Sequence, residues 1–507
     1  MNRIVIVVLV VFAVIQGSWT LLPAQYIPQV TPEHKQLFVD DHIIGKLVNV
    51  KRTLHQPTKH PDPMIRPVHP WENFVVQART APFWVPDEKL WKFYYMAFAK
   101  KGKGTKEQHT SLVAVSKDGL RWDKPVLNLV EWDGSKANNL VAEHDRSEQF
   151  LYHVVYDPHD VPERRYKGMF GIGKRQPAVS PDGLHWTPLE VSAVPSADES
   201  QMIYDELGKQ FLSTVKHAAP YGRSVYLAVS KDFANWTEPR LIFHADGEDQ
   251  VVGRQRIAER VSDPRWVPMA INQPSHYNVD IYNMPVFPYE GMYLGLPMKF
   301  HQTGPTPIGN QDGFHMVEMV STRDLREWQR VAGRAIFIPL SYDGLGRYDT
   351  GTIVPPTRPI VRDGELWLYY SGMRRRFQPD NIGPLVDGRR RYVSVPDNGA
   401  ILLAKLRLDG FVSMDAGHQE GTLTTVRLNL EGRRLFVNAD ASGGQIRAEI
   451  LGPTDTFSLD KSIPVKGDHL KGELKWKGTP NWAALEGKQV RIRFHMRQAS
   501  LYAFWTE

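Results

Sequence analysis

A seven-residue pattern that occurs four times constrains the fold of this chain more than any other feature. Its clearest copy reads Ser116-Lys117-Asp118-Gly119-Leu120-Arg121-Trp122, and further copies begin at Ser180, Ser230 and Ser321, the last with one extra residue. In every copy the tryptophan follows the aspartate by four positions. Serine and aspartate accept backbone N–H bonds in tight turns, glycine adopts positive φ, and tryptophan packs back on a sheet. Each copy therefore predicts a β-hairpin.

These hairpins belong to a longer repeated design. The copies lie roughly 50 to 90 residues apart, and three of them follow alternating apolar runs. Five segments share a polar opening, a β-rich run, a turn and a second strand, with no helical period between them: residues 79–96, 152–170, 198–215, 280–296 and 349–370. The pattern predicts an all-β fold with a five-bladed β-propeller over residues 36–410, in which the strand near Phe38 completes the last blade.

The pattern of the sequence changes after Gly410. From there to the C-terminus the chain consists of short alternating strands separated by glycine and aspartate turns. This pattern is typical of a β-sandwich, which we expect over residues 411–507, packed against the propeller.

The N-terminus has the pattern of a secretory signal. Arg3 precedes twelve apolar residues, Ile4 to Ile15, and small residues follow. This run is short for a membrane span, which needs about twenty residues. We therefore expect a signal peptide over residues 1–24, no membrane insertion after its removal, and a secreted or periplasmic protein. An uncleaved anchor is the alternative.

Composition and charge exclude several classes of function. The chain has no cysteine, which rules out disulfides, thiolate nucleophiles and cysteine-ligated metals. Its formal net charge of +6 comes mostly from scattered basic residues without a nucleic-acid motif, so we expect no nucleic-acid partner. Two clusters, Arg374–Arg376 and Arg389–Arg391, flank one loop. They form either a solvated loop or a cationic rim that favours acidic or sulfated substrates.

The candidate catalytic residues open the predicted segments. In a propeller the inner strands start around a central channel, so polar residues from distant parts of the sequence converge there. Three of the five openings carry carboxylates, and these are the catalytic candidates: Asp198, Glu199, Asp280 and Asp349. Neighbouring carboxyls repel one another and titrate at different pH, which suits the acid and base roles of glycosidic cleavage.

Further polar residues are candidates for substrate binding: Arg79, His153, Tyr282, Arg347, Asp41 and Glu72. The histidines lack metal-ligand spacing, and the sequence has no serine-nucleophile motif, phosphate loop or dinucleotide fingerprint. We therefore expect no metal and no cofactor. Four aspartates in hairpin turns are expected to be structural: Asp87, Asp157, Asp205 and Asp363.

The chain resembles a known group of enzymes. The stretch Leu37-Phe38-Val39-Asp40-Asp41, the repeated hairpins and the stretch Leu408-Asp409-Gly410-Phe411 are similar to bacterial exported proteins assigned to the five-bladed glycoside hydrolases, near families 32 and 43. The resemblance implies furanosidase or related activity from inner-strand carboxylates, with a C-terminal sandwich like that of family 32. The family motifs Trp-Met-Asn-Asp-Pro-Asn, Arg-Asp-Pro and Glu-Cys are absent here, so individual catalytic residues do not transfer.

We therefore expect a glycoside hydrolase that cleaves a polysaccharide or oligosaccharide. A sialidase-like exo-glycosidase is the second hypothesis, because the repeated hairpin resembles the Asp box of that group. Arg79, Arg256 and Arg347 would then supply its arginine clamp. The third hypothesis is a propeller that binds carbohydrate without cleaving it.

Overall fold

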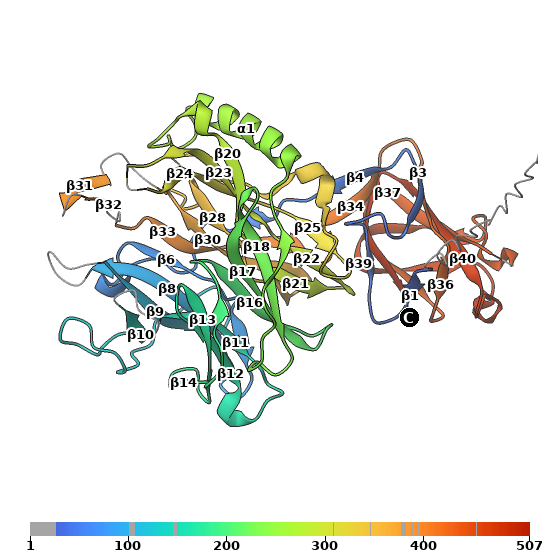
Figure 1. Ribbon diagram of the computed structural model, residues 1–507. Coiled ribbons are helices and arrows are strands. Elements are labelled where there is room, and N and C mark those ends of the chain that lie inside the picture. Colours follow the sequence, from blue (N-terminus) through green and yellow to red (C-terminus); the bar gives the residue numbers. More distant parts are fainter. Residues whose placement is uncertain are drawn as a thin grey trace, which may run out of the picture.

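The computed structural model describes the following stretches of the chain (Figure 1): residues 27–100, 107–144, 150–307, 309–344, 346–376, 382–386, 389–392, 396–452 and 454–507. The predicted signal peptide lies entirely outside them. Across the described residues the protein is nearly all β-structure in several sheets, with one α-helix, α1 (Gly247–Ser262). Short 3₁₀ helices occur at Pro70–Glu72, Pro162–Arg164, Pro274–His276, Val331–Arg334, Asp455–Phe457 and Trp482–Leu485.

The strands between residues 75 and 243 form three successive antiparallel meanders. The first consists of β6 (Val75–Gln77), β8 (Leu90–Lys100), β9 (Glu107–Ser116) and β10 (Leu140–His144), with β7 (Phe83–Val85) beside β8. The second consists of β11 (Leu151–Tyr156), β12 (Tyr166–Phe170), β13 (Lys174–Ser180) and β14 (Thr187–Pro188), with β15 (Val194–Pro195) beside β13. The third consists of β16 (Ser200–Asp205), β17 (Gln210–Ala219), β18 (Gly222–Ser230) and β19 (Arg240–Phe243).

Two more meanders follow. The fourth is split into an inner part, with β20 (Asn278–Asn283), β23 (Met298–Pro305), β24 (Gln311–Glu318) and β27 (Ile336–Ile338), and an outer part, with β21 (Val286–Tyr289), β22 (Met292–Gly295), β25 (Val320–Thr322) and β26 (Gln329–Arg330). The fifth consists of β28 (Thr352–Val354), β30 (Glu365–Met373), β33 (Gly399–Arg407) and β5 (Thr58–Lys59), with β29 (Ile360–Arg362) beside β30. A separate hairpin, β31 (Ile382–Val386) and β32 (Arg389–Tyr392), interrupts it.

The fifth meander is joined to two others through single parallel residue pairs. Gly399 pairs with Val75 and His315 with Thr352, which links the fifth meander to the first and to the fourth in one 14-stranded sheet. Each predicted segment coincides with the early strands of one meander, so the all-β prediction is confirmed at this level. The strands of the described residues do not form a closed ring of hydrogen-bonded sheets, so the five-bladed propeller stays a prediction.

Both chain ends share a second, 12-stranded sheet. The early strands β1 (Gln29–Val30), β2 (Gln36–Leu37), β3 (Ile44–Val48) and β4 (Lys51–Leu54) pair with strands after residue 411. The later strands are β34 (Val412–Ala416), β35 (Gly421–Thr425), β36 (Leu428–Leu430), β37 (Leu435–Leu451), β38 (Ser462–Ile463), β39 (Val465–Trp476), β40 (Gln489–Arg497) and β41 (Ala499–Thr506). The prediction that the strand near Phe38 completes the last blade is therefore wrong, because β2 pairs with β41 and β5 pairs with β33.

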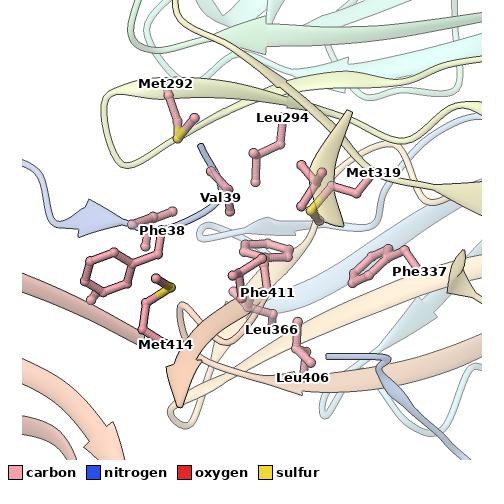
Figure 2. Packing of buried hydrophobic residues seen from close by; sticks show 14 of the residues in the cluster. Phe38, Val39, Met292, Leu294, Met319, Phe337, Leu366, Leu406, Phe411 and Met414 are labelled. Carbon is pink, nitrogen blue, oxygen red and sulfur yellow. The ribbon is translucent and has the colours of Figure 1, made fainter. Parts of the chain in front are cut away.

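The two groups of sheets are joined by a shared apolar core. Phe38 and Val39 leave β2 and become buried, although the sequence predicts that they continue a strand. Figure 2 shows them among Leu294 of β22, Leu366 of β30 and Phe411, which comes from the link between β33 and β34. Burying side chains of this size stabilises the fold by about 1.5–3 kcal/mol each. The apolar residues 37–39 therefore help to hold the 12-stranded sheet against the five meanders.

The helix α1 was not predicted from the sequence. Only Asp249, Gly253, Ile257 and Arg260 of α1 are buried, so the buried stripe holds two charged residues and one glycine and lacks a clear apolar period. The helix starts instead from a capping box between Asp246 and Asp249. Gly253 is required by packing, since a Cβ there would lie 2.0 Å from Val279 Cγ2.

The repeated hairpins form as predicted. In the first copy Asp118 Oδ1 accepts hydrogen bonds from the backbone N–H groups of Leu120 and Arg121, both at 2.8 Å, and Trp122 Nε1 donates to the Gly119 carbonyl at 3.0 Å. The copies at Ser180 and Ser230 repeat this arrangement. In the fourth copy Thr322 takes the role of the first serine, so the extra residue inferred there is not part of the turn.

The aspartate of each hairpin should contribute to stability through its charge. Backbone and side-chain hydrogen bonds from Asn235 lower the pKa of Asp232 to about 2. Because the folded pKa is depressed, this stabilisation is complete above the unfolded pKa of about 3.9 and disappears as the pH falls toward 2. We expect Asp232→Ala to lower the free energy of unfolding by about 1 kcal/mol at pH 7, as for loss of a helix cap, and by less at pH 3. Urea unfolding at the two pH values measures this, with Asp232→Asn as the control that keeps an acceptor oxygen. An equal loss at both pH values would contradict the charge argument.

Candidate active site

Two adjoining cavities lie where the meanders meet. The first, which we call the Glu199 cavity, has a volume of about 300 Å³, and the second, the Asp280 cavity, about 640 Å³. Asp198, Tyr282 and Asn310 line both. The Glu199 cavity receives residues from all the meanders: Gln77, Arg79, Met96, Phe98, His109, Phe150, Tyr152, Ile172, Asp198, Glu199, Tyr282, Met298, Asn310, His315, Thr352, Val354, Met373, Arg375 and Arg376. Strand openings far apart in the sequence therefore converge on one place.

Arg79 and Glu199 form a buried two-point ion pair. Arg79 Nε donates to Glu199 Oε2 and Arg79 Nη2 to Glu199 Oε1, both at 2.6 Å, while Asn283 Nδ2 donates to Oε2 at 3.1 Å. Both side chains are more than nine-tenths buried. Burial works against the charge of Arg79, but Glu199 outweighs it and raises the pKa of Arg79. Both oxygens of Glu199 are thus occupied, and the pair fixes the wall of the cavity.

His153 lies behind this wall. Its Nδ1 donates to the Arg79 carbonyl at 2.9 Å, and its Nε2 accepts from the Ser200 hydroxyl at 2.6 Å. The Ser200 oxygen accepts in turn from Arg175 Nε at 2.6 Å. Burial, and then the charge of Arg175, lower the pKa of His153 well below its usual value, so the ring is neutral. His153 therefore supports Arg79 and does not line the cavity, although the sequence suggests that it binds substrate.

Asp198 is held in its ionised form. It forms an ion pair with Lys216 and accepts a hydrogen bond from the Tyr282 hydroxyl at 3.2 Å. Burial would raise the pKa of Asp198, but Lys216 and Tyr282 outweigh it and lower the pKa. The Lys216 ammonium lies 3.8 Å from the centre of the Tyr282 ring, and the Asp198 side chain is 52% exposed. The carboxylate is therefore both charged and accessible.

Asp280 differs from Asp198 in its burial and in the direction in which its pKa is shifted. It is 1% exposed, and its Oδ2 accepts hydrogen bonds from Gln302 Nε2 at 2.8 Å and Arg223 Nη1 at 2.9 Å. Its Oδ1 is buried and has no partner among the described residues. Burial raises the pKa of Asp280, and Arg223 only partly opposes this. Asp280 and Asp198, which line the same cavity, are thus shifted in opposite directions.

Tyr282, which lines both cavities, belongs to a group of aromatic rings with His315 and Phe300. The ring of His315 stacks on Phe300 at 4.3 Å and meets the edge of Tyr282 at 4.9 Å. Burial, and then the neighbouring arginines, lower the pKa of His315 well below its usual value. Its Nε2 is buried without a partner among the described residues.

Asp349, predicted as catalytic, does not line either cavity. It is fully buried, where its Oδ2 pairs with Lys59 Nζ at 2.6 Å and accepts from the Tyr370 hydroxyl at 2.9 Å. The physical reason is that the ammonium of Lys59, far away in the sequence, pairs with the Asp349 carboxylate inside the core. Its contacts are those of a buried ion pair.

Three residues predicted to bind substrate also lie elsewhere. Glu72 is buried between Lys124 and the Tyr95 hydroxyl, and Arg347 donates to the backbone carbonyls of residues 60 and 61. Asp41 is exposed and paired with Arg52, beside the 12-stranded sheet. The arginine clamp of a sialidase is not assembled either, because Arg256 pairs with Glu318 and Arg347 lies away from Arg79.

Lys216, Arg223 and Asn283 complete the site but were not predicted from the sequence. Lys216 lies one residue beyond the predicted segment 198–215, and Arg223 sits near the start of β18, which was not considered as an inner strand. Among the described residues there is no group of three or more histidines and carboxylates that could hold a metal ion. In the part of the chain that the structure describes, no helix is long and apolar enough to cross a membrane.

Comparison with known proteins gives distant likenesses. No protein-family model matches the chain, and no curated protein matches it. An N-acetylgalactosamine deacetylase from F. plautii, in complex with blood group B trisaccharide, is 12% identical with a TM-score of 0.40, covering 71% of this chain and 96% of that one. A glycosyl hydrolase from Bacteroides ovatus is 13% identical with a TM-score of 0.39, covering 74% and 97%. A structure described with the GH130 family, whose glycoside hydrolases target β-1,2 mannosidic linkages in Candida mannan, is 12% identical with a TM-score of 0.39, covering 70% and 94%.

Proposed function

We propose that this protein is an exported glycoside hydrolase that cleaves glycosidic bonds in an oligosaccharide or polysaccharide. The observation that carries the proposal is the pair of carboxyls on the Asp280 cavity, one with a raised and one with a lowered pKa. Groups whose environments push their pKa values apart can serve as acid and base at one pH. Hydrolysis of a glycosidic bond needs both states at once.

The roles follow from the surroundings of each carboxyl. Asp280, buried and protonated to higher pH, gives its proton to the departing glycosidic oxygen. Asp198, ionised by Lys216, stabilises the positive charge that develops on the sugar ring and takes a proton from the water molecule that adds to the ring carbon in place of the departing oxygen. Tyr282 holds Asp198 in place through its hydroxyl, and Arg223 with Gln302 holds Asp280. Glu199 takes no part in proton transfer, because both of its oxygens accept from Arg79.

The architecture that we propose is a five-bladed β-propeller followed by a β-sandwich. The five antiparallel meanders and the convergence of all of them on the Glu199 cavity support the propeller. The early strands β1–β4 lie in the 12-stranded sheet, so the sandwich takes strands from both ends of the chain. The N-terminal apolar run supports export.

The proposal is tested by release of reducing sugar from a panel of plant, algal and microbial polysaccharides. We expect wild type to hydrolyse at least one of them, and Asp198→Asn to lose at least about 100-fold in kcat/KM, since the charge at the reaction centre disappears. Asp363→Asn is the matched control, because this aspartate lies in an exposed hairpin turn, and it should retain full activity. Binding of a glycan without any hydrolysis would favour the non-catalytic hypothesis.

A further inference from the structure

The side chains that line the two cavities include more cations than carboxylates. The carboxylates are Asp198, Glu199 and Asp280, and each is paired with one cation: Lys216, Arg79 and Arg223 respectively. Arg375 and Arg376 also line the Glu199 cavity. The lining thus contains five cationic side chains and three carboxylates.

Arg375 is fixed at its backbone and free at its side chain. Its N–H donates to Asn398 Oδ1 at 3.2 Å, and its carbonyl accepts from Asn398 Nδ2 at 2.9 Å. Asn398 itself is 3% exposed, so the base of Arg375 is firmly held. The guanidinium of Arg375 lines the cavity and makes no hydrogen bond or ion pair with another described residue.

Its neighbours in the triplet have other tasks. Arg374 donates to the Asp397 carbonyl at 2.9 Å, pairs with the Asp397 carboxylate at 3.2 Å, and does not line the cavity. Arg376 donates to the Gln311 carbonyl at 3.0 Å and to Asn310 Oδ1 at 3.2 Å, with its guanidinium 4.7 Å from the centre of the Phe300 ring. Arg376 adds positive charge to the wall of the Glu199 cavity, while the guanidinium of Arg375 is available to bind a ligand.

The apolar side chains that line the Glu199 cavity strengthen the attraction between its arginines and an anion. Met96, Phe98, Phe150, Met298 and Met373 line the Glu199 cavity together with the arginines. An apolar wall lowers the local dielectric, so a guanidinium there attracts an anion more strongly than it would on an open surface. Arginine also matches carboxylate and sulfate geometry with two parallel N–H groups.

We infer that the substrate is an anionic glycan whose carboxylate or sulfate ester binds Arg375 in the Glu199 cavity while the adjoining sugar reaches the Asp280 cavity. This inference rests on the proposed glycoside hydrolase function for the cleavage itself, but not for the recognition of the anion. It identifies the substrate class as glycans bearing uronic acids or sulfate esters.

The test measures binding apart from catalysis. Asp280→Asn enzyme, which should turn over its ligand about 10²–10⁴-fold more slowly, is applied to a glycan array with neutral, uronate-bearing and sulfated glycans. Hits are titrated by calorimetry. We expect the bound glycans to be anionic, and added Arg375→Gln to weaken their binding about 10- to 100-fold, as for loss of a hydrogen-bonded charge pair. Added Arg374→Gln is the matched control from the same triplet and should leave the affinity unchanged. The carboxylate and sulfate arms of the array distinguish the two anions.

The outcomes separate the two hypotheses. Preferential binding of neutral glycans, binding of no glycan, or equal weakening of neutral and anionic ligands by Arg375→Gln would overturn the anion inference. Hydrolysis of a neutral polysaccharide by wild type together with such a result would leave the proposed function standing. Arg375-dependent binding of anionic glycans that wild type never cleaves would support the inference and overturn the hydrolase.

Discussion

Replacing Asp280 by asparagine should abolish most of the activity while leaving the fold intact. General acid catalysis contributes about 10²–10⁴-fold, so kcat/KM on natural glycans should fall by that factor. Asparagine has the same shape, and Gln302 Nε2 and Arg223 Nη1 can still donate to its oxygen. The melting temperature should therefore change little, which separates loss of a proton donor from loss of structure.

The pH profile and the leaving group show whether Asp280 is the acid. Because burial raises its pKa, the proton is retained to higher pH, and wild-type activity should fall on the alkaline side as Asp280 ionises. Activity should fall on the acidic side as Asp198 gains a proton. Aryl glycosides with a good leaving group need less protonation, so Asp280→Asn should lose much less activity on them. An equal loss on both kinds of substrate would exclude the acid role.

Removing one member of the Arg79–Glu199 pair should cost more stability than any other change proposed. Arg79→Met leaves the Glu199 carboxylate buried without its cation, and breaking a buried pair in this way costs about 3–5 kcal/mol. Urea unfolding followed by tryptophan fluorescence measures the loss. Binding should also fail, because Arg79 and Glu199 form the wall of the cavity.

The double variant Arg79→Met, Glu199→Gln is the control. Here no uncompensated charge remains, so it should recover much of the stability lost in Arg79→Met. Arg358→Met, which removes an exposed arginine paired with Glu206, should change the free energy of unfolding by less than about 1 kcal/mol. If the double variant is as unstable as the single one, packing and not charge explains the effect of Arg79.

The sequence indicates the strands and part of the site for identifiable reasons. The repeated aspartate-to-tryptophan spacing specifies a local turn, which depends on neighbouring residues only, and all four hairpins form. Asp198 and Glu199 directly precede β16, and Asp280 and Tyr282 lie in β20. The sequence indicates them because residues at the beginning of neighbouring strands come to the same edge. Whether each is catalytic stays a prediction.

The remainder depends on contacts that local patterns do not encode. Asp349 has the same kind of sequence context as Asp280, yet Lys59, nearly 300 residues earlier, draws its carboxylate into the core. The helix α1 owes its place to Gly253 packing on Val279 and to a capping box, and its polar stripe gives no periodic signal. Lys216 sits at the far end of a long strand, and only the path of β17 brings it to Asp198.

The pairing of β2 with β41 has a consequence for synthesis of the protein. Leu37 lies opposite Ala503, and the Thr506 hydroxyl donates to the Val30 carbonyl at 3.2 Å. Strands near the beginning of the chain therefore cannot complete these contacts until β41 has been synthesised. Contacts this distant along the chain form slowly, because a very long loop must close first. Until β41 has been synthesised, Phe38 and Val39 have no complete surface to cover them. A nascent or truncated chain is therefore the form most in need of a chaperone.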